Sequence, residues 1–313
     1  MGSISSFFTL LFSFFSAVTP IIAAPLVERG INSDLLANFN LFEQYAAAAY
    51  CSGNNDSPNS KVTCPYGNCP LVQAASTITL TEFQNSLRTD VTGFVATDTT
   101  NNLTILSFRG SASIQNWLTN LDLSTIPTDL CPGCTAHSGF WSSWLESRTG
   151  VLDAIKTAAR ENPGYKLIVT GHSLGGAIAT LAAAELRNSG YETALYTFGA
   201  PRIAGPKLSS FISQQPGGNY RVTHWNDPVP RLPPIPMGFV HVSPEYYIDK
   251  GNNQAVGSGD VKVLEGSVNL RGNSGWLVTD VGAHAWYFND IAKCYTNALF
   301  NGKKRGVKMV KMF

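Results

Sequence analysis

The chain has 313 residues, of which 44% are hydrophobic, enough apolar material for the core of one large α/β domain. Only 14% of the residues are charged and the net charge at pH 7 is +1. The composition therefore gives no indication of a nucleic-acid partner or of a strongly charged substrate.

The N-terminal segment predicts a signal peptide over residues 1–24. Residues 7–18 form an apolar run, and small residues follow at Ala23 and Ala24. No Lys or Arg precedes this run, but it is too short to span a membrane comfortably. We therefore expect a secreted, extracellular protein with no transmembrane segment in its mature form, and a pro-segment at residues 25–29.

The even number of cysteines agrees with an oxidising compartment. Short spacings predict loop disulfides between Cys64 and Cys69 and between Cys131 and Cys134, which leaves Cys51 with Cys294. Cys131 and Cys134 have two other interpretations: a redox dithiol, or half of a zinc site whose other half is Cys64 and Cys69. Both are disfavoured in a secreted chain.

Two further segments carry surface features. Asn55-Asp56-Ser57 and Asn102-Leu103-Thr104 are acceptor sequences for N-glycosylation, and Pro58 weakens the first. The tail at residues 301–313 is basic and lies beyond the last cysteine. Its pattern is typical of a solvated end, with weak adsorption to anionic lipid as the alternative.

The predicted elements alternate between helices and strands. Apolar residues recur at helical spacing over residues 34–50, with Ser33 or Asp34 as the N-cap. Further helices are predicted at 139–160 and 178–186, and strands at 91–96, 103–108, 167–169, 194–198, 221–224 and 261–264. This order predicts an α/β fold with a mostly parallel sheet, helices on both faces, and one domain over residues 30–300.

The most informative motif is Gly-x-Ser-x-Gly at residues 171–175. It follows the apolar strand at 167–169 and leads into an Ala-rich helix, which is the order of a nucleophile elbow. Gly171 and Gly175 allow close backbone approach around the tight turn. Ser173 at its tip is therefore predicted to be a catalytic nucleophile, which indicates an esterase.

A serine nucleophile needs a histidine base, and in α/β-hydrolases this histidine comes last in the chain. His137 precedes the serine, His172 adjoins it, and His224 falls in a predicted strand. Of the remaining two, His241 alternates with apolar residues as in a strand. His284, in a loop of small residues, is the preferred base.

The acid that orients the histidine should follow a strand and precede His284. Asp227 follows the predicted strand at 221–224 and is the preferred candidate. Asp249, Asp260 and Asp280 are the alternatives, and Asp280 is too near His284 in sequence to reach its Nδ1 easily.

The oxyanion formed during attack needs backbone N–H donors. One should be Leu174, directly after the nucleophile, and a second should come from a loop after an earlier strand. Residues 108–111 fit this position, which makes Ser111 the second predicted donor.

A short amphipathic helix is predicted directly after this loop. Its apolar residues are spaced at i, i+3, i+4 and i+7, and they are Ile114, Trp117, Leu118 and Leu121. Such a stripe is more often a core contact. Beside an oxyanion donor, however, it also predicts a lid that turns its apolar face onto lipid.

Taken together, these segments resemble the secreted triacylglycerol lipases of filamentous fungi in the class 3 lipase family, of the Thermomyces and Rhizomucor type. The resemblance covers roughly residues 30–295, and its motifs lie at 39–51, 107–111, 171–177, 226–234 and 283–288. One departure is the tail, because relatives commonly end close to the last cysteine.

The resemblance implies an α/β-hydrolase fold and a mechanism without cofactor or catalytic metal. It implies a triad of Ser173, Asp227 and His284, oxyanion donors at Ser111 and Leu174, and a lid at about 113–119. It also implies the disulfides Cys51–Cys294, Cys64–Cys69 and Cys131–Cys134.

We therefore expect a triacylglycerol lipase that adsorbs to lipid surfaces and cleaves acylglycerol esters through an acyl-enzyme. A feruloyl esterase or a phospholipase A1 on the same fold is the alternative. A non-catalytic lipid-binding relative is disfavoured, because such proteins usually lose a member of the triad.

Overall fold

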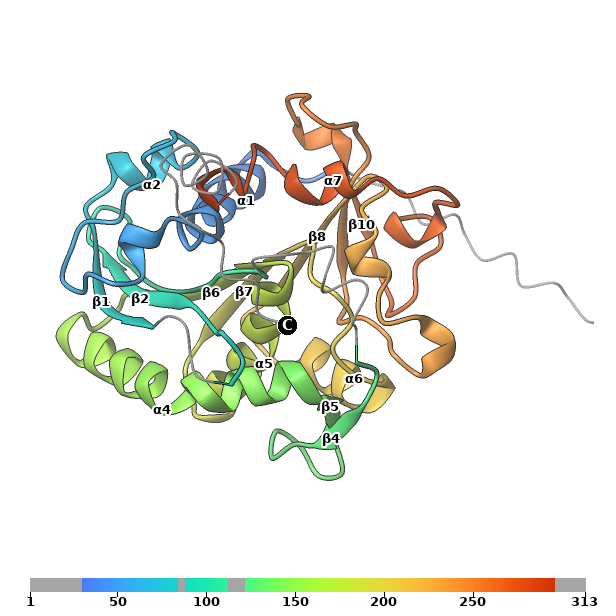
Figure 1. Cartoon of the computed structure of the whole chain (residues 1–313), viewed down its shortest axis with the longest axis horizontal. Helices are drawn as coiled ribbons and strands as arrows, with labels where there is room; N and C mark the ends of the chain where they lie inside the picture. Colours follow the sequence, from blue (N-terminus) through green and yellow to red (C-terminus); the bar gives the residue numbers. More distant parts are fainter. Residues whose placement is uncertain (1–29, 84–87, 112–121, 296–313) are drawn as a thin grey trace, which may run out of the picture.

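The computed structural model describes residues 30–83, 88–111 and 122–295, which are organised around an eight-stranded sheet (Figure 1). Its strand order is β1-β2-β3-β6-β7-β8-β9-β10. The strands are β1 (Thr77–Phe83), β2 (Gly93–Asp98), β3 (Leu103–Phe108), β6 (Lys166–His172), β7 (Thr193–Phe198), β8 (Asn219–His224), β9 (Glu245–Ile248) and β10 (Val261–Leu264). Strands β3, β6, β7, β8 and β9 run parallel, and the flanking pairs are antiparallel. The carboxyl ends of the parallel strands therefore meet at one edge, where ligands bind in open α/β sheets.

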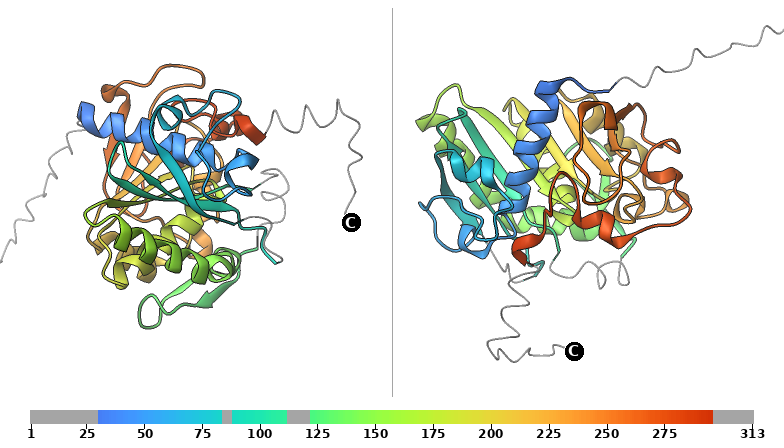
Figure 2. Two further views of the ribbon diagram at one scale, coloured as in Figure 1. Left: turned by 90° about the vertical axis from the view of Figure 1, so that its left-hand side faces the viewer. Right: turned by 90° about the horizontal axis from the view of Figure 1, so that it is seen from above.

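Helices cover both faces of this sheet (Figures 1 and 2). Helix α1 (Ser33–Ala48) crosses one face, while α4 (Ser138–Glu161), α5 (Leu174–Asn188) and α6 (Pro206–Gln214) cover the other. The smaller elements are α2 (Pro70–Ala74), α7 (Val281–Ala285), the β4–β5 pair (Thr125–Pro127 and Thr135–His137) and five 3-10 turns: η1 (Ser52–Asn54), η2 (Val229–Arg231), η3 (Ile235–Met237), η4 (Ser258–Asp260) and η5 (Asn273–Gly275).

Each face of the sheet has its own apolar core. The α1 side is rich in aromatic residues: Phe39 packs edge-on against Tyr196, which stacks on Tyr220 at 4.3 Å between ring centroids. On the α5 side, the alanines of α5 let the helix lie close to β6 and β7, and large side chains such as Trp144 fill the core between α4 and α5. Close packing on this side holds the start of α5 firmly at the edge where the parallel strands end.

Most predicted elements are confirmed, with shifts of a few residues at their ends. The helix expected at 34–50 is α1, but its N-cap is Asn32, whose Oδ1 accepts a hydrogen bond from Leu35 N at 2.8 Å. Strands β1 and β9 and helix α6 were not predicted. The expectation that His241 lies in a strand was wrong, since it precedes β9 in an irregular segment.

The described residues contain three disulfides, Cys51–Cys294, Cys64–Cys69 and Cys131–Cys134. They leave no thiol for the redox or zinc interpretations in this part of the chain. Among the described helices, none combines the length and the apolar character that crossing a bilayer requires. The predicted signal peptide (1–24), pro-segment (25–29), lid helix with Ile114, Trp117 and Leu118, and basic tail (301–313) lie outside the described residues.

Candidate active site

Ser173 occupies the turn between β6 and α5. Its backbone has φ 57° and ψ −129°, a region that a serine rarely adopts and that marks a strained turn. Two backbone hydrogen bonds hold it there: Ser173 N donates to Phe198 O at 2.9 Å, and Gly176 N donates to Ser173 O at 3.0 Å. The strand, turn and helix predicted from the sequence are therefore all present around Ser173.

The glycines around Ser173 are required because the backbone is crowded. A Cβ on Gly171 would lie 2.4 Å from Gly175 O, and a Cβ on Gly175 would lie 2.2 Å from Phe108 O. Both contacts are far inside van der Waals distance and both involve backbone atoms that cannot turn away. The elbow is thus wedged between its own helix and the end of β3.

The loop after β3 lies directly against Ser173, the predicted nucleophile. A Cβ on Gly110 would lie 2.9 Å from Ser173 Cβ, so the backbone of this loop reaches the side of the serine. Ser111 follows Gly110 and is half-buried, while Leu174 opens α5 on the other side of Ser173. The two predicted oxyanion donors therefore belong to the two backbone segments that adjoin the serine.

Asp227 and His284 meet at the same edge. Asp227 follows β8 and is fully buried, and its Oδ2 lies 2.8 Å from Nδ1 of His284 in α7. Its other oxygen, Oδ1, accepts the backbone N–H of Val229 at 2.8 Å, which fixes the plane of the carboxylate. A proton on His284 Nδ1 is thereby held by the carboxylate, and Nε2 is left as the basic nitrogen.

Two polar atoms of the site, Ser173 Oγ and His284 Nε2, have no hydrogen-bond partner in the described part of the chain. Both atoms are buried. A buried hydroxyl and a buried imidazole nitrogen are normally satisfied. Buried polar groups without a partner are expected at a site where they bind or react with a substrate.

Tyr287 contacts Asp227, the predicted acid, and was not itself predicted from the sequence. Its hydroxyl donates to Asp227 Oδ2 at 2.6 Å, and burial raises the pKa of the Tyr287 hydroxyl well above its usual value, so it stays a donor. Gly199 makes room for this arrangement, because a Cβ there would lie 2.7 Å from the Tyr287 hydroxyl and 3.0 Å from Asp227 Oδ2. The only signal in the sequence was an aromatic residue one helical turn after His284.

A second unpredicted contact runs through His172. Its Nε2 donates to the backbone carbonyl of His284 at 2.8 Å, and its Nδ1 accepts from the Tyr50 hydroxyl at 2.6 Å. Complete burial lowers the pKa of His172 well below 6.5, so the ring is neutral and this tautomer is fixed. Three segments of the site are thus linked by one buried chain of hydrogen bonds.

Asn273 holds the loop that carries Asp227. Its Nδ2 donates to Asp227 O at 2.9 Å and to Trp225 O at 3.1 Å, and Trp225 has the unusual φ of 36°. Its backbone N–H in turn donates to the buried carboxylate of Glu245 at 3.2 Å. The strained turn after β8 is therefore stabilised from a segment 46 residues further along the chain.

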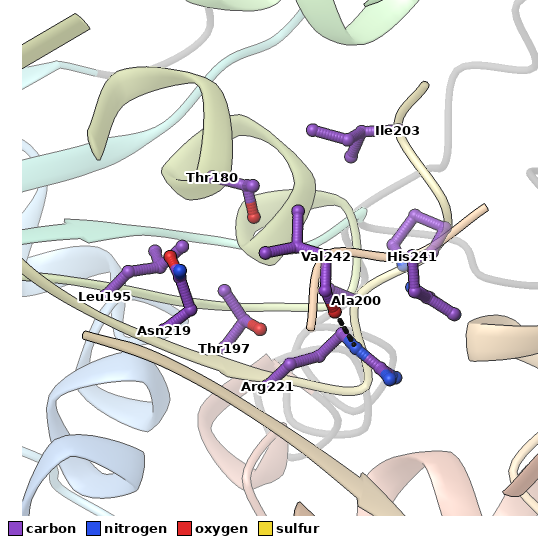
Figure 3. Close-up of a pocket in the computed structure, with 10 residues that line it drawn as sticks. Thr180, Leu195, Thr197, Ala200, Ile203, Asn219, Arg221, His241 and Val242 are labelled. Atoms are coloured by element: carbon purple, nitrogen blue, oxygen red, sulfur yellow. Dashed lines mark hydrogen bonds between the residues drawn. The ribbon is translucent and has the colours of Figure 1, made fainter. Parts of the chain in front are cut away.

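His241, the alternative base, is engaged elsewhere. Figure 3 shows it in the wall of a small buried cavity with Arg221 and Thr197, where Arg221 Nε donates to Val242 O at 2.9 Å. His241 Nε2 donates to Pro230 O at 2.6 Å, and burial beside Arg221 and Arg202 lowers its pKa well below 6.5. His241 is thus a structural residue, satisfied by its neighbours as the sequence indicated.

The alternative acids are also engaged elsewhere. Asp280 Oδ1 accepts the backbone N–H of Gly282 at 2.8 Å and caps α7. Asp249 and Asp260 form ion pairs with Lys262 and Lys250, both at 2.8 Å. Asp227 alone of these four carboxylates contacts His284 in the described structure.

Exposed apolar side chains lie on the loop that leads into α7. Leu277 is 97% exposed and Val278 is 72% exposed, and Val281 follows with 41%. The backbone beneath them is tied to the acid loop, because Asp280 N donates to Asn226 O at 3.1 Å and Asn226 Nδ2 donates to Val278 O at 3.3 Å. We call Leu277, Val278 and Val281 the apolar rim, since they precede His284 by only a few residues.

The fold and this arrangement define the α/β-hydrolase class: a mostly parallel sheet flanked by helices, with a strained serine after one strand and an Asp–His pair after later elements. Sequence comparison then gives the family. Residues 105–237 match the family described as lipase (class 3), and residues 4–80 match its N-terminal region. The chain belongs to the class 3 lipase family.

Two relatives are similar over most of their length. The chain is 43% identical to secreted mono- and diacylglycerol lipase A of Penicillium cyclopium over 294 residues, 91% of this chain and 95% of the relative. It is 42% identical to secreted mono- and diacylglycerol lipase 1 of Fusarium solani over 260 residues, 83% of this chain and 78% of the relative. Like these proteins, the chain is secreted.

Solved structures give the same result. The mono- and diacylglycerol lipase of Aspergillus oryzae superposes with a TM-score of 0.80 at 43% identity, covering 83% of this chain and 98% of that one. The Rhizomucor miehei lipase in complex with its propeptide superposes with a TM-score of 0.73 at 27% identity, covering 85% of this chain and 84% of that one.

Proposed function

We propose that the protein is a serine hydrolase that cleaves acylglycerol esters through an acyl-enzyme. The observation that supports this most directly is the 2.8 Å contact between Asp227 Oδ2 and His284 Nδ1 at the strand edge that carries the strained Ser173. A carboxylate on Nδ1 leaves Nε2 free to accept a proton from a serine hydroxyl.

In this mechanism, Ser173 Oγ attacks the ester carbonyl carbon while His284 Nε2 takes the hydroxyl proton. The oxyanion accepts hydrogen bonds from the backbone N–H groups of Leu174 and Ser111. As the tetrahedral intermediate collapses, His284 returns the proton to the leaving glycerol oxygen. Water, deprotonated by the same histidine, then releases the fatty acid and restores Ser173. Asp227 stabilises the imidazolium that forms in each half of the cycle.

Replacing Ser173 by Ala tests this assignment. Loss of the nucleophile should reduce kcat on an ester substrate by roughly 10⁴-fold or more, while the thermal unfolding midpoint stays within a few degrees of wild type. The activity is measured on a dissolved short-chain ester, so that adsorption to lipid plays no part. Normal turnover by the folded variant would remove Ser173 from the mechanism.

We further infer that mono- and diacylglycerols are better substrates than triacylglycerols. The two secreted relatives with 42–43% identity are named as mono- and diacylglycerol lipases. Initial rates on emulsified monoolein, diolein and triolein decide this directly. A rate on triolein equal to the others would restore the triacylglycerol lipase expected from the sequence.

The apolar rim supports a lipid substrate over a feruloyl ester, because exposed apolar side chains that lie close together mark a surface that binds an apolar partner. We propose that Leu277, Val278 and Val281 contact the acyl layer when the enzyme adsorbs. Replacing Leu277 and Val278 together by Asp should reduce hydrolysis of emulsified diolein at least tenfold and leave the rate on a dissolved ester within about twofold. Replacing Leu145, an exposed leucine on α4, by Asp is the matched control. Equal loss on both substrates, or no loss on either, would contradict a role in adsorption.

A further inference from the structure

The two N-glycosylation sequences differ sharply in their surroundings, although both have the required Asn-x-Ser/Thr pattern. We propose that Asn102 carries an N-linked glycan and that Asn55 does not. The proposal depends on the secretory route of the chain, not on the chemistry proposed for Ser173. The modification joins C1 of the first N-acetylglucosamine to Nδ2 of asparagine. The bond from C1 to the lipid-linked pyrophosphate donor breaks, and Nδ2 loses one proton.

Asn102 is the last residue of the turn between β2 and β3. It is exposed and has a φ of 54°, a left-handed conformation that asparagine tolerates better than most residues. The turn is held without the Asn102 side chain, since Lys166 N donates to Asn102 O at 3.0 Å and Thr100 N donates to Asp98 Oδ1 at 2.9 Å. In the part of the chain that the structure describes, the Asn102 side chain makes no hydrogen bond. Its amide nitrogen can therefore be substituted at no cost to the fold.

The space beside Asn102 is open enough for a sugar. Asn102 lines a hollow of about 680 Å³ whose polar wall includes Asn38, Asn101 and Lys166. These amide and ammonium groups can donate hydrogen bonds to sugar hydroxyls and to the acetamido oxygen. The half-buried Leu41 and Tyr220 supply an apolar surface in the same hollow.

Asn55 is in the opposite situation. It is only 3% exposed, and its Nδ2 donates to Ala49 O at 2.8 Å and to Cys51 O at 3.4 Å. These carbonyls belong to the end of α1 and to the start of the Cys51–Cys294 disulfide. A glycan on Nδ2 does not fit in the interior, so the Asn55 side chain would have to turn to the surface and lose both hydrogen bonds. The native end of α1 and a glycan on Asn55 therefore exclude each other.

The position of Asn102 also separates the glycan from the active site. Asn102 directly precedes β3, whereas the predicted oxyanion loop at residues 109–111 follows it. Six residues of strand span roughly 20 Å. Because β3, β6, β7 and β8 are parallel, Ser173 and Asp227 lie at the same end as that loop. A large hydrophilic glycan at Asn102 thus leaves the apolar rim free.

The experiment uses the full chain secreted from a glycosylating fungal host. Peptide N-glycosidase F in ¹⁸O-water converts a glycosylated asparagine to ¹⁸O-labelled aspartate, and mass spectrometry of the wild-type peptides locates the label. We expect the label at position 102 and none at position 55. A wild-type protein without label, or with label at position 55, would overturn the proposal whether or not any variant folds.

Two variants add a matched comparison. Ser57→Ala removes the first acceptor sequence and should keep the wild-type mobility shift on deglycosylation. Asn102→Gln should abolish that shift, while hydrolysis of emulsified diolein stays within about twofold of wild type. A shift that persists in Asn102→Gln would overturn the assignment, as would its loss in Ser57→Ala.

Discussion

Ser173 and His284 are held at the same sheet edge by different physical means. Around Ser173 the contacts are steric and lie between backbone atoms, with Gly171 and Gly175 against carbonyls that cannot move aside. Around His284 the contacts are hydrogen bonds from side chains distant in sequence, through His172 to its carbonyl and through Asp227 to its ring.

This difference predicts two kinds of tolerance to substitution. A steric contact between backbones is either satisfied or broken, since each atom has only tenths of an ångström to give. A network of hydrogen bonds can lose one member and keep its geometry with the others, at about 1.5 to 3 kcal/mol for each bond to a charged group. Substitutions at the elbow should thus act nearly all-or-none, and those around the histidine should be graded.

Gly175→Ala should have the largest effect. Its Cβ would lie 2.2 Å from Phe108 O and 2.7 Å from Arg109 O, so α5 or the predicted oxyanion loop must move. We expect kcat/KM on a dissolved ester to fall by at least 10³-fold and the unfolding free energy to fall by about 1–3 kcal/mol. Gly150→Ala is the control, because Gly150 lies in α4 with nothing within 4 Å of a Cβ. That variant should gain about 0.5–1 kcal/mol with unchanged kinetics. A fully active Gly175→Ala protein would end the steric account of the elbow.

Tyr287→Phe should have an intermediate effect. It removes the 2.6 Å hydrogen bond to Asp227 Oδ2 and leaves the Val229 N–H and His284 in place. Loss of about 1.5 kcal/mol corresponds to roughly a tenfold fall in kcat/KM. A change in the pH profile of kcat/KM would distinguish an effect on the Asp–His pair from mere loosening. Tyr196→Phe, on the α1 side of the sheet, removes another buried hydroxyl and should leave both rate and profile unchanged. A loss above 10³-fold in Tyr287→Phe would contradict the graded response.

The smallest expected effect is on stability and concerns Glu43, which is linked through Asn289 to Tyr287, three residues after His284. Asn289 Nδ2 donates to Glu43 Oε2 at 2.7 Å, and Asn289 O accepts from Tyr287 N at 3.1 Å. Burial raises the pKa of Glu43 well above 4.5, with Asp290 adding to the shift. The folded state therefore holds this proton more tightly than the unfolded state. The stability that Glu43 contributes is complete below pH 4.5 and is lost as pH rises through the folded pKa.

Glu43→Gln removes this pH dependence. Urea denaturation at pH 5, 7 and 9 should show wild type losing stability relative to the variant as pH rises, by on the order of 1 kcal/mol. Glu161→Gln, at the exposed end of α4, is the control and should follow wild type. If the free energy of unfolding of the variant fell relative to wild type between pH 5 and pH 9, Glu43 would be charged in the folded protein.

The elbow around Ser173 could be predicted from the sequence more fully than the hydrogen bonds around His284. The elbow is local: strand, glycines, serine and helix are contiguous, so Ser173 could be placed from residues 166–186 alone. Asp227 and His284 were inferred from chain order and strand ends, and the structure brings their side chains together.

The supporting residues could not be inferred in this way. Tyr50 contacts His172 across 122 positions, and Asn273 reaches Asp227 across 46. No local pattern encodes such pairs. Strand β1 was a different kind of omission, since Thr-Ile-Thr-Leu-Thr alternates polar and apolar residues and period-two analysis would have found it. Strand β9, Glu-Tyr-Tyr-Ile, has no regular alternation of polar and apolar residues and gives no such signal.

The Cys51–Cys294 disulfide closes a covalent ring of the chain that spans a sequence separation of 243. Ser173, Asp227, His284 and both predicted oxyanion donors lie inside this ring. A single proteolytic cut anywhere between the two cysteines would open the ring but leave both fragments joined. Processing of the segments outside it, before Cys51 or after Cys294, would leave the ring closed. In a secreted protein, this disulfide therefore keeps the two fragments covalently joined after a single cut by an extracellular protease.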